Sequence, residues 1–314
     1  MATYTVVLTD QVFPDVELER TMLSAIDAEL VIPPGDHEAV MAVATDADAI
    51  LNTYFPIGAD DVARFRRVRI IARYGIGVDN LDVEAARAAG IHVTNVPDYS
   101  VEEVAVHTLT ILLAALRRLP QAMGVAATGR WSIDPIRPIE RISESTIGII
   151  GLGRIGQRVA ALLRPLGARI VGFDPYVNVS IDGVETVGSL EELLTVADVV
   201  TLHVPLTPET RGLMGAARLA LMRPTAILVN TSRGGLIPTG DLVDALRAGV
   251  IGGAAVDVLE REGEDASDIA GMSNVILTPH MAYYSESALR ESQRKATTQV
   301  IKVLRGDAPD YPVG

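Results

Sequence analysis

Short apolar runs rich in β-branched residues alternate with longer amphipathic segments along most of the chain. Such runs are typical of strands, and the segments of about a dozen residues between them are typical of helices. Strands separated by helices predict βαβ units and a parallel sheet. The runs form two sets, at residues 3–9, 47–53, 69–75 and 91–96, and then at 146–151, 168–174, 198–204, 226–232, 252–258 and 274–280. The pattern therefore predicts an α/β protein with two doubly wound parallel-sheet domains.

The segment between the two sets of strands predicts a long, mostly buried helix over residues 100–119. Ser100 stands at its N-cap position and Glu103 follows three residues later, which is the arrangement of a capping box. An irregular segment with two prolines leads to the second set of strands. Helical spacing returns in the tail, over residues 285–306.

The composition is that of a globular chain, because 48% of the 314 residues are hydrophobic. This length suggests about two domains. No apolar stretch approaches the roughly 20 residues of a membrane span, and the N-terminal segment with Asp10 does not resemble a signal peptide. There is no cysteine, which excludes disulfides, zinc–thiolate sites and thiol nucleophiles. We expect a cytoplasmic protein with no metal site and no membrane partner.

The charge of the chain disfavours nucleic acids as partners. A net charge of −13 and a pI near 4.8 repel phosphate backbones. A small anionic substrate is compatible with this charge where arginines are placed locally. We therefore expect a small-molecule ligand.

Three glycines, Gly151, Gly153 and Gly156, follow a predicted strand and precede a predicted helix in the spacing G-x-G-x-x-G. In a dinucleotide-binding turn the first glycine allows a tight turn, the second lets a pyrophosphate approach the backbone, and the third lets helix pack on strand. The alternative is a glycine-rich turn without a ligand. The next strand ends at Asp174, where a carboxylate can accept hydrogen bonds from ribose hydroxyls and repels the 2′-phosphate of NADP. The sequence predicts NAD as the cofactor.

Arg233, Glu262 and His280 stand after later strands, where ligands bind in open α/β sheets. Hydride transfer to a 2-keto acid needs a held carboxylate, a polarised carbonyl and a proton. A guanidinium binds a carboxylate bidentately, and a histidine exchanges protons near neutral pH. A neighbouring glutamate would orient the ring and favour its protonated form.

Each of these residues also has a plainer interpretation. Arg233 can be a surface ion-pair residue, and His280 a core histidine. Glu262 lies in the charged run EREGED, where Glu260 or Glu264 can be confused with it. The remaining histidines without a comparable context are interpreted as structural: His37, His92 and His107.

Five stretches together resemble the D-isomer-specific 2-hydroxyacid dehydrogenases, the family of phosphoglycerate, D-lactate and glyoxylate/hydroxypyruvate enzymes. The resemblance covers nearly the whole chain. The stretches are RYGIGVDNLDVEAARAAGIHVTNVPDYSVEEVA, GIIGLGRIGQRVA, LHVPLTPETRGLM, ILVNTSRGGLI and AAVDVLEREG with NVILTPHMA.

This resemblance implies roles for individual residues. Arg233, Glu262 and His280 match the catalytic arginine, glutamate and histidine of the family. Ile76 and Gly77 match a loop whose backbone N–H groups meet the substrate carboxylate. The implied cofactor contacts, among which Asp257 would hold the nicotinamide amide, are Thr108, Gly151, Gly153, Arg154, Ile155, Gly156, Asp174, His203, Thr207, Thr231 and Asp257.

The family fold implies a Rossmann NAD-binding domain of residues 99–284, inserted in a flavodoxin-like substrate domain of residues 1–98 and 285–314. The family is usually homodimeric, with the helix near 100–119 in the contact, so we expect a homodimer. Gly263 departs from the family, which commonly has a proline there. The stretches FDPYV and MAYYSESA are similar to the C-terminal-binding-protein subgroup, which leaves an NAD(H)-sensing corepressor or scaffold as an alternative function.

We interpret the chain as an NAD-dependent oxidoreductase that interconverts a D-2-hydroxy acid and its 2-keto acid. In the reduction, Arg233 would bind the carboxylate and polarise the keto oxygen, His280 would protonate the forming alkoxide, and Glu262 would orient His280. Tyr283 is expected to border the substrate pocket and to favour keto acids with an apolar side group. The alternative for Tyr283 is a packing role.

Overall fold

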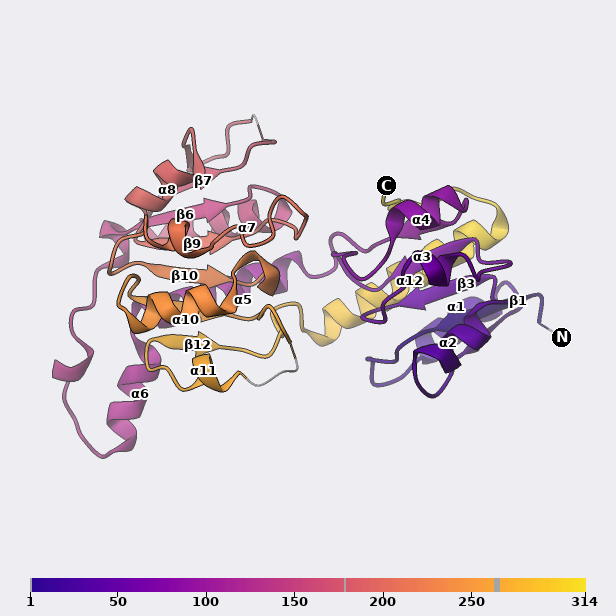
Figure 1. Ribbon diagram of the computed structural model, residues 1–314, viewed down its shortest axis with the longest axis horizontal. Helices are drawn as coiled ribbons and strands as arrows, with labels where there is room; N and C mark the ends of the chain where they lie inside the picture. Colours follow the sequence, from indigo (N-terminus) through magenta and orange to yellow (C-terminus); the bar gives the residue numbers. More distant parts are fainter. Residues whose placement is uncertain (1, 178, 263–265) are drawn as a thin grey trace. The chain divides into compact units, whose positions relative to one another are not determined.

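The computed structural model describes residues 2–177, 179–262 and 266–314. Its contacts divide the chain into two compact units (Figure 1). Unit 1 takes the chain up to Tyr99 and again from Ser285 onward, and unit 2 takes Ser100–Tyr284. Unit 2 is therefore inserted into unit 1 along the sequence.

Unit 1 is built on a five-stranded sheet in its described residues, in the order β2-β1-β3-β4-β5, and every pair is parallel. This is the strand order of flavodoxin-like doubly wound sheets. The strands are β1 (Tyr4–Leu8), β2 (Ala28–Val31), β3 (Ala49–Asn52), β4 (Ile70–Arg73) and β5 (His92–Thr94). The helices are α1 (Glu17–Ser24), α2 (His37–Ala44), α3 (Ala59–Val62), α4 (Val83–Ala88) and α12 (Glu286–Arg305).

Unit 2 is built on a seven-stranded sheet over the described ranges, in the order β12-β11-β10-β9-β6-β7-β8, again with every pair parallel. Numbered within the unit, this is the strand order of a Rossmann fold. The strands are β6 (Thr146–Ile150), β7 (Arg169–Phe173), β8 (Glu185–Thr186), β9 (Val199–Leu202), β10 (Ile227–Asn230), β11 (Gly253–Val256) and β12 (Val275–Leu277). The α-helices are α5 (Val101–Leu116), α6 (Leu119–Ala127), α7 (Arg154–Leu163), α8 (Leu190–Val196), α9 (Ala216–Leu219), α10 (Thr239–Arg247) and α11 (Ser267–Ala270).

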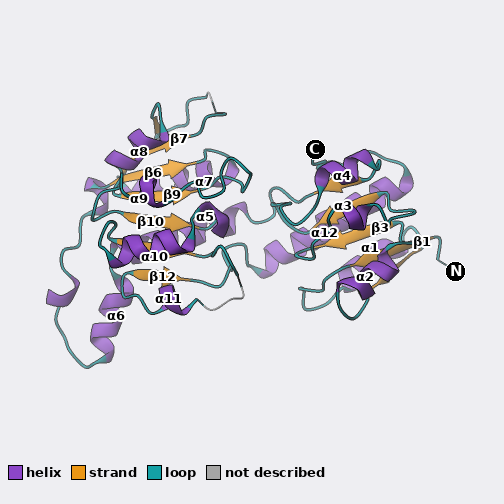
Figure 2. Ribbon diagram, in the orientation of Figure 1, coloured by secondary structure: helices purple, strands orange, loops and turns teal. Residues whose placement is uncertain are grey.

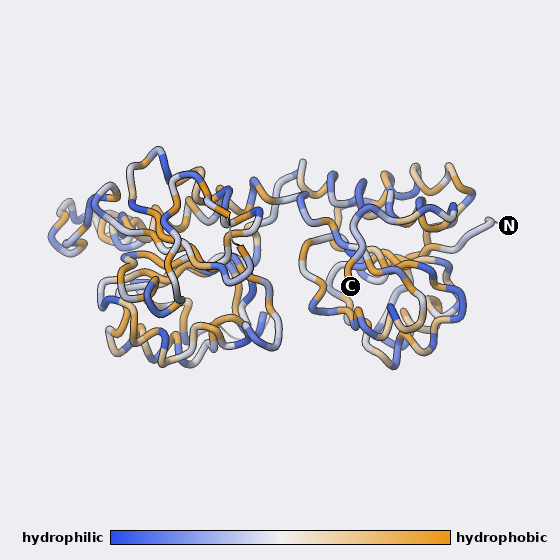
Figure 3. The backbone as a smooth tube through the Cα atoms, turned by 90° about the horizontal axis from the view of Figure 1, so that it is seen from above, coloured by the Kyte–Doolittle hydropathy of each residue, from blue (hydrophilic) through white to orange (hydrophobic). Residues whose placement is uncertain are grey.

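The inner strands of unit 2, such as β6, β9 and β10, are continuous apolar runs because both faces of the sheet are covered there. On β10, Leu228 packs into one core and Val229 into another. Side chains of α8, α10 and α11 complete the first core, and those of α5 and α7 complete the second, so helices cover both faces (Figure 2). Hydrophobic residues accordingly gather along the inner strands of each unit (Figure 3). The predicted class, α/β with two doubly wound parallel sheets, is confirmed.

The helix expected over residues 100–119 is shorter than predicted. α5 ends at Leu116, Arg118 adopts a left-handed conformation with φ of 50°, and Pro120 lies in the first turn of α6. The predicted capping box is wrong, because the Ser100 side chain makes no cap hydrogen bond. Its ψ of 21° departs from the extended conformation of a side-chain N-cap. Among the described residues no single helix is long and apolar enough to span a membrane, whereas α5 and α6 together, bent by 59°, meet both criteria.

A buried carboxyl group joins three elements of unit 1. Glu19 on α1 is fully buried, and Gln293 of α12 donates from Nε2 to both of its oxygens, at 3.0 and 3.1 Å. The hydroxyl of Tyr74, just after β4, donates to the same carboxyl at 3.0 Å. Burial raises the pKa of Glu19 above its ordinary value of 4.5, because the charged form loses its hydration.

Candidate active site

The turn between β6 and α7 holds three glycines in different surroundings. Gly151 has a φ of +91°, and a Cβ atom there would lie 2.4 Å from the carbonyl oxygen of His203. A Cβ atom on Gly156 would lie 2.0 Å from the carbonyl oxygen of Gly151. At Gly153 a Cβ atom would meet nothing within 4 Å in the described residues. The fold therefore requires two of the glycines, and the third faces open space.

This open space lies at the N-terminus of α7. The helix begins at Arg154 after its N-cap residue Gly153, and no described side chain caps its first N–H groups. Free N–H groups and the helix dipole favour an anion at this end. Arg154 is exposed there, while Ile155 packs against the core. The turn thus fits the pyrophosphate of a dinucleotide.

Asp174 follows β7 and lies beside the glycine turn. Its Oδ2 accepts a hydrogen bond from the backbone N–H of Leu152 at 2.8 Å, within the turn itself. Its Oδ1 accepts from the N–H of Tyr176 at 2.9 Å. The carboxylate is therefore held in one orientation next to the position that a pyrophosphate would take.

His203 follows β9 and contacts the glycine turn through its backbone. Its Nε2 lies 3.0 Å from the hydroxyl of Thr201, and its buried Nδ1 has no hydrogen-bond partner among the described residues. Burial lowers the pKa of His203 to about 3, because the protonated ring would lose its hydration. The ring is neutral at physiological pH, and its Nδ1 is a buried polar atom whose hydrogen-bonding capacity is unused within the described residues.

The remaining threonines of the implied cofactor set fall into two groups. The hydroxyls of Thr108 on α5 and Thr231 after β10 lie 2.7 Å apart, and both residues are buried. Thr207 lies in the loop after β9, where its N–H donates to the hydroxyl of Thr210 at 2.8 Å. The structure therefore joins the first two threonines to each other and places Thr207 in a separate loop.

Glu262 and His280 form a close pair after the neighbouring strands β11 and β12. The distance between Glu262 Oε2 and His280 Nδ1 is 2.7 Å, with the two side chains 44% and 27% exposed. Glu260 instead accepts a hydrogen bond from the N–H of Thr239 at 3.2 Å. Gly263 and Glu264 lie outside the described residues. Of the described glutamates in this run, Glu262 is the one beside the histidine.

Arg233 follows β10, the strand next to β11, so it lies at the same edge of the parallel sheet as Glu262 and His280. The side chain of Asn230 shapes its loop, donating to the carbonyl of Arg233 at 2.9 Å and accepting from the N–H of Ser232 at 3.0 Å. Arg233 Nη1 donates to the carbonyl of Ser232 at 2.9 Å. An arginine, a glutamate and a histidine thus follow the carboxyl ends of three neighbouring strands. At this end of the sheet a substrate carboxylate could be bound and a proton transferred.

Tyr283 lies beside His280. Their ring centroids are 6.0 Å apart and the rings meet edge to face, with an interplanar angle of 85°. Ile76 and Gly77 belong to unit 1, where they follow β4; the side chain of Asn95 donates to the carbonyl of Ile76 at 2.7 Å and holds that loop.

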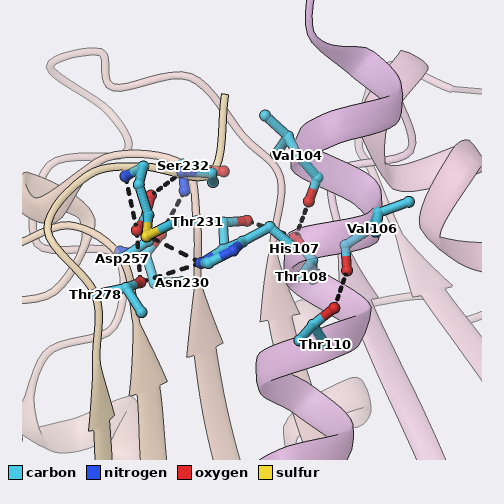
Figure 4. A network of polar contacts seen from close by, with 12 residues as sticks. Val104, Val106, His107, Thr108, Thr110, Asn230, Thr231, Ser232, Asp257 and Thr278 are labelled. Atoms are coloured by element: carbon cyan, nitrogen blue, oxygen red, sulfur yellow. Dashed lines mark hydrogen bonds and ion pairs between the residues drawn. The ribbon is translucent and has the colours of Figure 1, made fainter. Parts of the chain in front are cut away.

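Asp257 stands directly after β11 and its side chain is fully buried. Its carboxylate accepts hydrogen bonds from the hydroxyl of Thr278 at 2.5 Å and from the N–H groups of Met281 at 3.0 Å and Ala282 at 2.8 Å. His107, for which no sequence pattern indicated a role at the site, reaches this group from α5 (Figure 4). Its partners stand more than a hundred residues away in the sequence, so only the fold reveals them.

Comparisons with known proteins point to one family. A family model described as "D-isomer specific 2-hydroxyacid dehydrogenase, NAD binding domain" matches residues 109–282. The chain is 40% identical to a D-3-phosphoglycerate dehydrogenase of Methanocaldococcus jannaschii, over 88% of this chain and 53% of that protein. It thus spans about half the length of this relative. A glyoxylate reductase of Aeropyrum pernix is 36% identical, over 97% of this chain and 94% of that protein.

A solved structure resembles the chain over nearly its full length. The D-lactate dehydrogenase of Aquifex aeolicus, complexed with NAD and lactic acid, is 29% identical with a TM-score of 0.89. The match covers 96% of each chain.

Proposed function

Because the chain belongs to the D-isomer-specific 2-hydroxyacid dehydrogenase family, we propose that it interconverts a D-2-hydroxy acid and the corresponding 2-keto acid with NAD(H). The observation that carries this proposal is the Glu262–His280 pair, with 2.7 Å between Oε2 and Nδ1, at the sheet edge that also carries Arg233. A carboxylate bonded to Nδ1 leaves Nε2 of the same ring to exchange a proton with a substrate oxygen.

The residues around the glycine turn would hold the cofactor. The free N–H groups at the start of α7 would bind its pyrophosphate, Asp174 its ribose hydroxyls, and His203 Nδ1 a polar group of the cofactor. The nicotinamide group, when bound, supplies or accepts the hydride. The negative charge of Asp174 supports a preference for NAD over NADP, because a 2′-phosphate beside it would be repelled.

The following residues would bind the substrate and exchange a proton with it. The guanidinium of Arg233 binds the carboxylate and polarises the keto oxygen through its rigid fork of donors. His280 gives a proton to that oxygen in the reduction and removes it in the oxidation. Glu262 keeps the imidazole in one orientation and stabilises its charged form. The family resemblance adds the backbone N–H groups of Ile76 and Gly77 as further donors to the carboxylate.

The position of Tyr283 beside His280 supports a finer proposal on the substrate. A tyrosine ring is a large and rigid apolar wall, and each methylene buried against it contributes about 0.8 kcal/mol. We therefore propose that 2-keto acids with an alkyl, thioether or phenyl group are better substrates than glyoxylate.

Exposed apolar residues along α6 and the segment after it support a homodimer. Met123 is 65% exposed and Trp131 is 97% exposed, with Leu119 and Ile133 also exposed. Apolar residues that are exposed together along one segment are typical of an interaction site where they form a contiguous patch, and a second copy of the chain is the partner that the family resemblance favours. The molar mass in solution, measured by light scattering after size-exclusion chromatography, would test whether the protein is a dimer. A cytoplasmic location is proposed with it, because a chain without cysteine is compatible with a reducing compartment.

The corepressor alternative is not retained. The relatives described above are named as dehydrogenases or a reductase, and the two stretches similar to the C-terminal-binding-protein subgroup add no feature of partner recognition.

A panel of 2-keto acids tests the proposal directly. Each acid is mixed with the protein and NADH, and the loss of NADH absorbance is followed, with NADPH in a parallel series. We expect turnover of at least one acid, with apolar side groups favoured and the Tyr283→Ala variant losing that preference. Absence of turnover with every acid would contradict the proposed reaction, and glyoxylate as the best substrate would contradict the role of Tyr283.

A further inference from the structure

The turn that carries His280 is folded around the carboxylate of Asp257. Consecutive N–H groups point at this residue: that of His280 donates to its carbonyl at 2.8 Å, and those of Met281 and Ala282 donate to its side chain at 3.0 and 2.8 Å. His280 itself has a φ of +51°, in the left-handed region that few residues other than glycine adopt and whose cost the surrounding contacts must offset. The hydrogen bonds to Asp257 therefore hold a strained turn in place.

A second part of this cluster is formed by Thr278 and His107. The hydroxyl of Thr278 lies 2.5 Å from Asp257 Oδ1, and a carboxylate only accepts, so the hydroxyl donates its single hydrogen there. Thr278 Oγ1 is also 3.1 Å from Nε2 of His107. With its own hydrogen already used, Oγ1 must accept from His107. The ring of His107 therefore carries a hydrogen on Nε2.

The position of His107 makes this donor part of the support of the site. Its side chain is 15% exposed and its Nε2 lies 3.6 Å from Asp257 Oδ1, so one ring N–H faces both the threonine and the buried carboxylate (Figure 4). The chain of contacts runs from α5 through Thr278 and Asp257 to the amides that follow His280. A change at His107, at the α5 end of this chain of contacts, should therefore alter the orientation of the His280 ring.

We propose that His107 is a positioning residue for His280: its Nε2–H orders Thr278 and Asp257, and these fix the turn that aims the catalytic imidazole. This inference rests on the proposed function, since His280 is a catalytic residue only there. It replaces the purely structural role that the sequence suggested for His107.

Three variants separate positioning from simple packing. His107→Leu removes the donor and keeps an apolar side chain. His107→Gln keeps an N–H donor close to the position of Nε2. Thr110→Val is the matched control on the same helix, because the hydroxyl of Thr110 donates to its own helix at Val106.

Two measurements are made on the full chain. For His107→Leu, kcat should fall about five- to tenfold, the usual effect of one lost hydrogen bond, while KM for NADH changes little. Hydrogen exchange, followed by mass spectrometry, should become faster in the peptide covering residues 278–284. His107→Gln should restore both values, and Thr110→Val should leave both at the wild-type level.

Hydrogen exchange keeps this inference separate from the proposed function. If no keto acid is turned over, the proposed function fails, yet faster exchange in His107→Leu and its rescue in His107→Gln would still support the link between His107 and the turn. Wild-type exchange and kcat in His107→Leu would overturn the proposal. If His107→Leu does not fold, Thr278→Val breaks the same link; wild-type exchange in that variant would also overturn it.

Discussion

Single substitutions of the glycines between β6 and α7 should distinguish the glycine that the packing of α7 requires from the glycine that cofactor binding requires. A Cβ atom on Gly156 would lie 2.0 Å from the carbonyl oxygen of Gly151, whereas real Cβ atoms essentially never approach another atom within 3.0 Å. In the Gly156→Ala variant, α7 and the turn must therefore separate by about 1 Å. Overpacking of this kind costs about 1–3 kcal/mol, and the rigid backbone neighbour places this variant at the upper end.

Gly153→Ala is the matched variant for the opposite effect. Its backbone, with φ of −72° and ψ of −165°, is one that alanine adopts without strain. No described atom lies within 4 Å of the added methyl group. The methyl group would stand where the pyrophosphate approaches, so it should weaken NADH binding at least about tenfold, which is 1.4 kcal/mol.

The two variants are compared by thermal unfolding without ligand and by NADH titration followed by fluorescence. A loss of 1 kcal/mol lowers Tm by about 2–4 °C in a domain of this size, so a cost of about 3 kcal/mol in Gly156→Ala should lower Tm by about 6–12 °C. Gly153→Ala should keep the wild-type Tm and lose affinity for NADH.

Two results would refute this reasoning. An unchanged Tm in Gly156→Ala would mean that the contact between α7 and the turn is not tight. Wild-type NADH affinity in Gly153→Ala would mean that no phosphate approaches the turn, and the assignment of the cofactor site would fail with it.

The other predictions concern the proposed catalytic histidine, the cofactor preference and the buried carboxyl group of unit 1. His280→Ala should lower kcat about 10²–10⁴-fold with little change in the Kd for NADH, and full turnover would contradict its role as the acid. Asp174 should favour NADH over NADPH at least about tenfold in kcat/KM, and Asp174→Ala should narrow that ratio; equal use of both cofactors by the wild type would contradict this. Burial raises the pKa of Glu19 above 4.5, so the stability it contributes is complete below pH 4.5 and is lost as the pH rises through the raised value. In urea unfolding at several pH values, Glu19→Gln should therefore gain stability relative to the wild type as the pH rises, and a difference independent of pH would refute the assignment.

Most strands could be predicted from the sequence because they are buried on both faces. β6 and β10, for example, lie within continuous apolar runs. β2 was missed because its four residues, AELV, include a glutamate at an exposed position, and β8 because it has only two residues, both exposed. Strands with exposed polar positions depend on pairing with a neighbouring strand, which no local pattern reveals.

The end of α5 shows a different limit. Apolar spacing continues past Leu116, so a pattern search extends the helix to residue 119. The chain instead turns at Arg118, with Pro120 in the first turn of the next helix. Proline is tolerated there but not in a helix interior, so the proline was a signal that apolar periodicity alone overlooks.

The candidate site could be located from the sequence, but not in its details. Arg233 and His280 follow predicted strands, so the edge of the sheet was known. The choice between Glu260 and Glu262 depends on the path of a loop, and spacing within EREGED does not determine it. His107 needed the complete fold, because its hydrogen bond to Thr278 joins α5 to the end of β12.

The insertion of unit 2 within unit 1 has a consequence for synthesis on the ribosome. All elements of unit 2 are contiguous, so its sheet can form as soon as Tyr284 has emerged. Unit 1 must wait for α12, whose buried face packs against β3, β4 and α1 and whose Gln293 pairs with Glu19. The first unit to be translated is therefore the last to be completed, and its nascent sheet keeps an uncovered apolar face while 185 residues of unit 2 are made. This interval is when the chain is most exposed to aggregation and most open to chaperones.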